Sequence, residues 1–327
     1  MEWAKLDLDP RIKDIICTSR LKSCSDILTA TRSELLNQTG LCFKDVNEVI
    51  KAVSKYVVKQ PPTSVLQKFR DPANLLNRKL SLGSPVLDEF LKGGILVERI
   101  TEISGGSASG KTQLCLQLAL TCQLPREQNG LNAGVAYICT EDAFPNKRFY
   151  QLKEIFRSKH HEIKDINLSD NVFIQHVADV DRLKKCIDNA VPALIQRNKI
   201  GLVIIDSVAA LFRGEYEQDY IRRANDLNCL GSRLHRFCFE YKITVVCVNQ
   251  ITDVPGGNSI PSLGIIWSNL INVRLFLSRE LTFTRPVMKI EGSESTSAVY
   301  RTLEVVFSPN LPKSTCRFKI DETGVSG

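Results

Sequence analysis

Eight residues at 105–112, Gly-Gly-Ser-Ala-Ser-Gly-Lys-Thr, have the types and spacing of a phosphate-binding loop. They fit the pattern G-x-x-x-x-G-K-[ST], the P-loop, in full: Gly105, Gly106, Ser107, Ala108, Ser109, Gly110, Lys111 and Thr112. In such a loop successive backbone N–H groups turn inward on a triphosphate, and glycine leaves room for that approach. Lys111 would reach the β- and γ-phosphates, and the Thr112 hydroxyl would bind the accompanying magnesium. The pattern therefore predicts a site for ATP and Mg²⁺.

The segments on either side of the P-loop agree with this prediction. Residues 99–103 form a predicted strand, and 111–124 form a predicted amphipathic helix. The phosphates would then sit at a helix N-terminus, where the helix dipole favours negative charge. A glycine- and serine-rich turn that matches by chance would lack this context.

Polar side chains at the ends of three later predicted strands would complete the site. Asp206 follows an apolar strand, as the acid near magnesium does in P-loop proteins, although an aspartate can also simply cap such a turn. Glu141 and Asp142 follow the strand that starts at Tyr137, and the residues alone do not show which acid would polarise the attacking water. The alternative for Glu141 and Asp142 is that they belong to a solvated acidic loop without a catalytic role. Gln250 ends the predicted strand 243–249 and could contact the γ-phosphate.

Bulk properties indicate a globular protein with more than one core. The chain has 327 residues, of which 43% are hydrophobic and 24% charged, so we expect two domains and, without a long apolar run, no membrane span. The start of the chain does not resemble a signal peptide, which predicts a cytosolic or nuclear protein. Eleven cysteines without a C-x-x-C pair are expected to be reduced core residues rather than zinc ligands. The net charge of +7 fits a polyanionic partner but is also common among ordinary proteins.

Periodicity divides the chain into three parts. Residues 1–58 are predicted to form a small helical domain, 59–79 a proline-containing linker, and 80–327 a core in which strands and helices alternate. The turn at 39–41 would suit either a helix-hairpin-helix unit or a purely structural hairpin. The core is predicted to hold a mainly parallel sheet, with antiparallel strands near 271–277, 287–290, 302–307 and 316–320 added at one edge.

Several separate passages, in order and spacing, resemble the RecA family in its eukaryotic recombinase branch. They are Leu80 to Gly83, Leu87-Asp88, Gly93-Gly94, the P-loop, Tyr137 to Arg148, His176 to Asp181, Val203 to Ala210, Ser308 to Pro312 and Gly324-Val325. The resemblance covers the whole chain. It implies a RecA-like P-loop ATPase core after a small all-α, helix-hairpin-helix-like domain, and a DNA-dependent ATPase activity, with which weak turnover is compatible.

The resemblance also implies individual roles. It makes Glu141 the acid that activates water, Arg148 the residue lying against the adenine and Gln250 the sensor of the γ-phosphate. Residues 308–312 would cap the nucleotide of an adjoining subunit. For Arg148, stacking of a guanidinium on a flat ring is physically reasonable, and a solvated helix arginine is the alternative.

The segments that face DNA in these recombinases depart from the family pattern. In the first, 213–225, Arg213 is kept, but Asp219 and Asn225 stand where those recombinases have arginine. Arg222 and Arg223 lie nearby and are, with Arg213, our candidates for DNA contact. The second loop, 251–263, has no aromatic residue to stack on bases. The linker lacks a clear Phe-x-x-Ala signature for head-to-tail assembly.

A kept ATP site with altered DNA loops indicates a recombination mediator, a RecA-family paralogue of the recombinases. We expect it to form a heterodimer with another RecA-family paralogue and to assist the recombinase filament at DNA double-strand breaks and stalled forks. Single-stranded or branched DNA would be contacted directly or through the partner, in the nucleus, with a cytoplasmic pool also allowed. The alternative is a strand-exchange enzyme that forms its own filament, which would need phosphate-binding charge in both loops. A scaffold with a vestigial pocket is disfavoured by the intact P-loop.

Overall fold

The computed structural model describes residues 3, 6–19, 21, 23–57, 64–70, 78–163, 166–214, 216, 219–253, 259–280 and 299–327. The chain divides into two compact units, Met1–Asn74 and Leu75–Gly327. Within the predicted linker a short helix, α5 (Val65–Arg70), is described, while 59–63 and 71–77, like the strand predicted at 287–290, lie outside the described residues. The domain boundaries at 58 and 79 therefore stay predictions.

In the smaller unit, the described residues up to 57 form a bundle of four α-helices, α1 (Pro10–Thr18), α2 (Cys24–Thr29), α3 (Arg32–Thr39) and α4 (Phe43–Val57). Helix α4 buries Val46, Val49 and Val53, which recur at helical spacing, against the apolar faces of the other three. Gly40 ends α3 in the left-handed conformation, with φ of +66°, and this allows the chain to turn sharply into α4. The turn predicted at 39–41 is thus a helix-to-helix connection.

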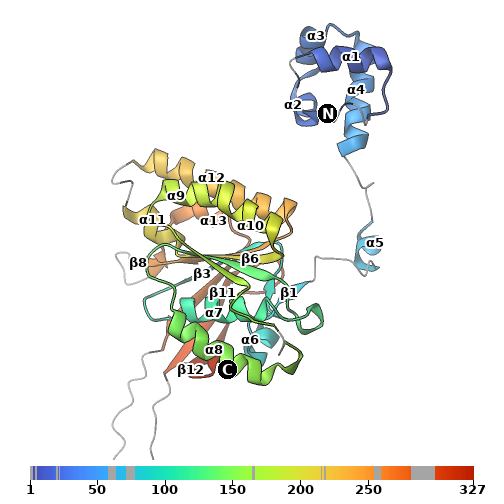
Figure 1. Cartoon of the computed structure of the whole chain (residues 1–327). Helices are drawn as coiled ribbons and strands as arrows, with labels where there is room; N and C mark the ends of the chain where they lie inside the picture. The colour runs from blue at the N-terminus through green and yellow to red at the C-terminus, as the bar shows by residue number, and fades with distance from the viewer. Residues whose placement is uncertain are drawn as a thin grey trace, which may run out of the picture. The chain divides into compact units, whose positions relative to one another are not determined.

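The larger unit is built on a nine-stranded sheet in the order β13-β12-β11-β10-β3-β7-β6-β4-β5 (Figure 1). Its strands are β3 (Ile100–Gly105), β4 (Gly134–Cys139), β5 (Val172–His176), β6 (Ile200–Asp206), β7 (Thr244–Asn249), β10 (Val273–Arg279), β11 (Tyr300–Phe307), β12 (Ser314–Asp321) and β13 (Gly324–Ser326). The six from β10 to β5 are parallel, and β11, β12 and β13 are added antiparallel. The predicted fold class is therefore confirmed. The prediction that 271–277 is an antiparallel addition was wrong, because β10 pairs with β3 in parallel and only the strands beyond it reverse direction.

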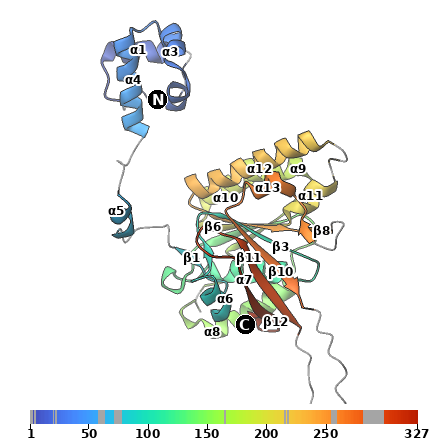
Figure 2. The same ribbon diagram turned by 180° about the vertical axis from the view of Figure 1, so that it is seen from behind.

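Helices cover both faces of this sheet (Figures 1 and 2). One face packs against α6 (Pro85–Phe90), α7 (Lys111–Thr121) and α8 (Asn146–Lys159). The other packs against α9 (Val180–Lys185), α10 (Val191–Arg197), α11 (Val208–Gly214), α12 (Tyr220–Glu240) and α13 (Gly264–Ser268). Strands β4, β6 and β7 contain continuous apolar runs because both of their faces are buried. Strand β3 is equally buried but carries the polar residues Thr101, Glu102 and Ser104.

Smaller elements connect these layers. They are the pairs β1 (Lys79–Leu80) with β2 (Ile95–Leu96) and β8 (Ile251–Asp253) with β9 (Ser259–Pro261), the 3₁₀ turns η3 (Arg126–Gln128) and η4 (His161–Ile163), and a π turn, η5 (Cys186–Ala190). The π turn connects α9 and α10 without a break, so residues 180–197 form one continuous helix, in agreement with the helix that the sequence predicts over 179–197. In the described part of the chain, no helix is both long and apolar enough to cross a bilayer.

One buried polar cluster ties four elements together beneath the P-loop. The Glu102 carboxylate on β3 is fully buried and accepts hydrogen bonds from Asn249 Nδ2 at 2.6 Å and from the indole Nε1 of Trp267 at 2.9 Å. Its other oxygen pairs with the buried guanidinium of Arg274 on β10. Because Asn249 directly precedes Gln250, this Glu102 cluster fixes the end of β7 at the edge where the predicted site lies.

The first DNA-facing segment is more helical than the sequence suggests. Helix α11 continues through Gly214 and α12 begins at Tyr220, so Arg222 lies in a helical turn rather than in a loop. Asp219, which stands where the recombinases have arginine, accepts the backbone N–H of Arg222 at 2.9 Å and caps α12. The acid at this position thus has a local structural use.

Candidate nucleotide site

The P-loop adopts a backbone that its two fixed glycines alone permit. Gly105 has φ of +154°, and a Cβ there would lie 2.2 Å from the carbonyl oxygen of Leu277. Gly110 has φ of +106°, and a Cβ there would lie 2.4 Å from the Cδ1 atom of Ile320. At Gly105 the close atom belongs to the backbone, so glycine is required by packing as well as by φ. At Gly110 the close atom is the end of a side chain that can shift, so the requirement there comes from φ. The hydroxyl of Ser109, also in this loop, is buried and has no hydrogen-bond partner among the residues that the structure describes.

Lys111 opens α7 and folds back over the loop that precedes it. Its Nζ donates to the carbonyl oxygens of Gly105 at 2.9 Å and Gly106 at 2.6 Å. Burial lowers the pKa of Lys111, while the carboxylates of Asp206 and Glu141 act in the opposite direction. The charged form of this amine is poorly solvated and is held by two neutral carbonyls, so an anionic phosphate beside it would stabilise the charge.

Asp206 ends β6 beside the start of α7. Its Oδ2 accepts from the Thr112 hydroxyl at 2.8 Å and from the Tyr137 hydroxyl at 2.9 Å. Burial raises the pKa of Asp206, against the opposing effects of these two donors and of Lys111. Tyr137 was not predicted as a site residue, because a tyrosine inside an apolar strand resembles an ordinary core residue. Its one signal is its place on the strand that leads to Glu141.

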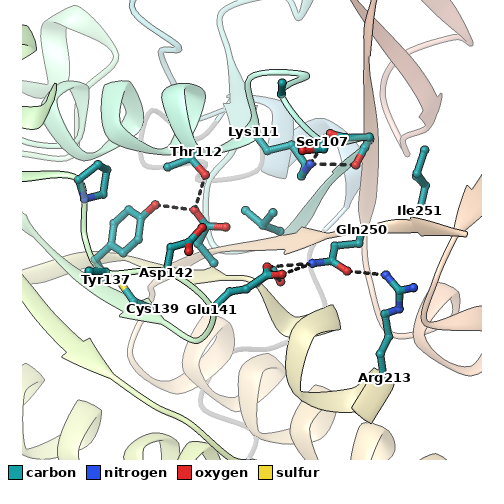
Figure 3. Close-up of a pocket in the computed structure, with 18 residues that line it drawn as sticks. Ser107, Lys111, Thr112, Tyr137, Cys139, Glu141, Asp142, Arg213, Gln250 and Ile251 are labelled. Carbon is teal, nitrogen blue, oxygen red and sulfur yellow. Dashed lines mark hydrogen bonds between the residues drawn. The ribbon is translucent and has the colours of Figure 1, made fainter.

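Glu141, Gln250 and Arg213 form a second chain of contacts in the same cavity (Figure 3). Gln250 Nε2 donates to Glu141 Oε1 at 2.7 Å and Oε2 at 2.8 Å, and Arg213 Nη1 donates to Gln250 Oε1 at 2.6 Å. The cavity measures about 580 Å³ and is lined by the P-loop and by the ends of β4, β6, β7 and α11. It therefore brings together Lys111, Thr112, Asp206, Glu141 and Gln250, as the strand ends predict, and adds Arg213.

Arg148 lies on α8, outside the lining of this cavity. Its guanidinium donates to the Oε1 atoms of Gln113 at 2.8 Å and Gln151 at 2.7 Å, and to the backbone carbonyls of Asp321 at 2.5 Å and Glu322 at 3.0 Å. These contacts hold it between α7 and the turn after β12. Its role against the adenine stays a prediction.

The three arginines predicted for DNA contact all interact within the chain. Arg213 binds Gln250, the Arg222 guanidinium lies 5.8 Å from the ring centre of Tyr216, and Arg223 Nη2 donates to the Ser262 carbonyl at 3.1 Å. Arg213 and Arg222 are both exposed and Arg223 is half-buried, and of the three only Arg213 lines the cavity. Their contact with DNA remains a prediction.

The residues present fit a magnesium nucleotide. Among the described residues no group of three or more His, Cys, Asp or Glu side chains could hold a metal. Magnesium bound with a nucleotide does not need such a cage, because phosphate oxygens and water supply most of its ligands beside one or two protein groups. Thr112 and Asp206 offer one hydroxyl and one carboxylate at the right end of the P-loop.

Comparisons with known proteins agree with this geometry. The model of the Rad51 family matches residues 77–327, and that of the XRCC3/RpoA-like helix-hairpin-helix domain matches residues 3–57. The chain is 39% identical to the DNA repair protein XRCC3 of Mus musculus, with 100% of this chain and 98% of that protein covered. It is 36% identical to an XRCC3 homolog of Arabidopsis thaliana (78% and 96% covered) and 30% identical to the DNA repair protein rhp57 of Schizosaccharomyces pombe (93% and 92%). The P-loop, the sheet order and these full-length matches together show that the chain belongs to the Rad51 family of RecA-like proteins.

Proposed function

We propose that this protein is an ATP-binding mediator of homologous-recombination repair, acting in a complex with another RecA-family paralogue. One observation carries the ATP-dependent part: Lys111 at the start of α7, Asp206 at the end of β6 and Glu141 just after β4 line a single cavity. The repair role is supported by full-length similarity to proteins named as DNA repair proteins. A nuclear location is part of the proposal.

Hydrolysis would use the two sides of the cavity differently. Lys111 and the P-loop N–H groups would bind the phosphates, and Thr112 and Asp206 would hold Mg²⁺, which when bound neutralises phosphate charge. Glu141 would accept a proton from water, and Gln250 would position that water or the γ-phosphate. In the structure both oxygens of Glu141 accept from Gln250, so this amide has to move before Glu141 can act as a base.

Replacing the proposed base tests this assignment. We expect Glu141→Gln to slow ATP hydrolysis by roughly 10²- to 10⁴-fold, the usual contribution of a general base, without loss of nucleotide affinity. Phosphate release and nucleotide titration measure the two effects. Asp142→Asn is the matched control, because Asp142 is the neighbouring acid and lines the same cavity. A large loss in Asp142→Asn with normal turnover in Glu141→Gln would reassign the base.

The mediator is favoured over a filament-forming recombinase by the first DNA-facing segment. There Asp219 caps a helix, and the nearby arginines are engaged by Gln250, Tyr216 and Ser262. A surface that holds the DNA backbone needs its cations free for phosphates, since neutralisation of phosphates supplies much of the affinity for single strands.

Co-purification and strand exchange separate these two functions. We expect the full chain to form a stable complex with a RecA-family paralogue in size-exclusion chromatography and to exchange no strands by itself. Filaments formed by the chain alone, with robust strand exchange, would make it a recombinase. A chain that stays monomeric with every such paralogue would remove the heterodimer from the proposal.

A further inference from the structure

The first DNA-facing segment reaches the nucleotide cavity through one side chain, Arg213. Helix α11 fixes its backbone, because Leu211 and Phe212 are buried in the core and the Phe212 ring stacks on Tyr216 at a centroid distance of 5.7 Å and an interplanar angle of 10°. The guanidinium points from the last turn of α11 toward Gln250 (Figure 3). Packing thus fixes the backbone of Arg213, and its exposed side chain is held by the hydrogen bond to Gln250.

The two ends of the Gln250 carboxamide have different partners. Its oxygen accepts from Arg213 at 2.6 Å, and its nitrogen donates to both oxygens of Glu141 at 2.7 and 2.8 Å. A carboxylate cannot donate a hydrogen bond and a guanidinium cannot accept one, so one orientation of the amide satisfies both neighbours. The cation and the anion also polarise the amide in the same sense, which strengthens both hydrogen bonds.

We propose that Arg213 is a positioning residue that holds Gln250 against Glu141, so that these three residues form a latch which a γ-phosphate must open. The inference rests on the proposed function and extends it to the control of this site. With the latch closed, the Gln250 amide nitrogen donates to both oxygens of Glu141 and is therefore engaged before a nucleotide binds. A triphosphate competes for the Gln250 amide donor, whereas a diphosphate lacks the phosphoryl group that would do so.

The latch makes a prediction about nucleotide preference that does not depend on turnover. The unsubstituted chain has to break the latch to engage a γ-phosphate, but not to bind ADP. Removing Arg213 loosens the latch, so the ratio of the ADP Kd to the AMP-PNP Kd should rise in Arg213→Gln by roughly threefold to tenfold, the size of a modest charged hydrogen bond. The Kd of ADP itself should stay within about twofold, a change of less than half a kcal/mol.

The experiment compares full-length variants by titration with ADP and with the non-hydrolysable AMP-PNP. Arg222→Gln is the matched control, since it removes the same charge from an exposed residue outside the cavity lining and should leave the ratio unchanged. Arg213→Lys keeps the charge and should restore part of the parent ratio. The double variant Arg213→Gln/Glu141→Gln should raise the ratio no further than the larger single effect, because both changes open the same latch.

Each other result counts against the latch. A fall in AMP-PNP affinity with unchanged ADP affinity would make Arg213 a direct ligand of the γ-phosphate. An unchanged ratio in Arg213→Gln, or an equal shift in Arg222→Gln, would make Arg213 an ordinary surface charge. If the unsubstituted chain and its paralogue complex bind neither nucleotide, the proposed ATP site itself is wrong. That result differs from failure of the latch, in which both nucleotides bind but the ratio of their Kd values does not change in Arg213→Gln.

Discussion

Substitution of Lys111 by alanine is expected to weaken ATP binding by roughly 10- to 100-fold, which corresponds to the loss of charge-assisted contacts to the phosphates. Lys111 is the P-loop cation, and in the structure it contacts two backbone carbonyls that hold no charge. Nothing in the loop replaces it, because residues 105–110 are glycine, serine and alanine. The stability of the fold without nucleotide should change little, because the substitution removes hydrogen bonds to uncharged backbone carbonyls and no ion pair with them.

Titration with ATP and thermal unfolding with and without nucleotide measure this effect. A ligand that binds the folded state raises its stability by RT ln(1 + [L]/Kd), so the nucleotide-dependent rise in Tm should shrink in Lys111→Ala. Lys147→Ala is the control, as Lys147 is an exposed lysine of α8 outside the cavity lining. Equal ATP affinity in Lys111→Ala and the unsubstituted chain would place the nucleotide elsewhere.

The Glu102→Ala variant is expected to lose roughly 3–5 kcal/mol of unfolding free energy, as when one partner of a buried ion pair is removed. Three donors lose their acceptor at once: Asn249 on β7, Trp267 on α13 and the buried cation Arg274 on β10. For a unit of this size, such a loss lowers Tm by about 6–20 °C. It should also loosen the end of β7 that carries Gln250.

Urea and thermal unfolding compare this variant with two others. Glu240→Ala removes an exposed ion pair, Arg236–Glu240 on α12, and should cost less than about 1 kcal/mol. The double variant Glu102→Met/Arg274→Met removes both charges and should recover part of the stability, because no buried charge is left unpaired. A Glu102→Ala protein as stable as Glu240→Ala would show that water or relaxation satisfies the cluster.

Those parts of the fold and site that local sequence determines were predictable. The P-loop is contiguous, and its glycines, lysine and threonine have their roles by spacing alone, so the motif and the strand and helix around it are evident without a structure. Continuous apolar runs such as 202–205 indicate doubly covered parallel strands, and the confirmed fold class follows from their alternation with helices. Strand-end polar residues such as Asp206 and Gln250 could be named as candidates for the same reason.

Contacts between strand ends were decided by tertiary structure. Gln250 and Glu141 are 109 residues apart, Tyr137 and Asp206 are 69 apart, and Asn249 and Glu102 are 147 apart. Each pair meets because the strands are ordered β3-β7-β6-β4 in the sheet, an order that no local pattern encodes. Arg213 shows the same limit, since its charge and loop position suggest DNA, and only the packing of α11 directs it to Gln250. Sequence alone thus determined which residues bear the chemistry, whereas the folded chain decided which of them meet, because hydrogen bonds act over a few ångströms of space regardless of separation along the chain.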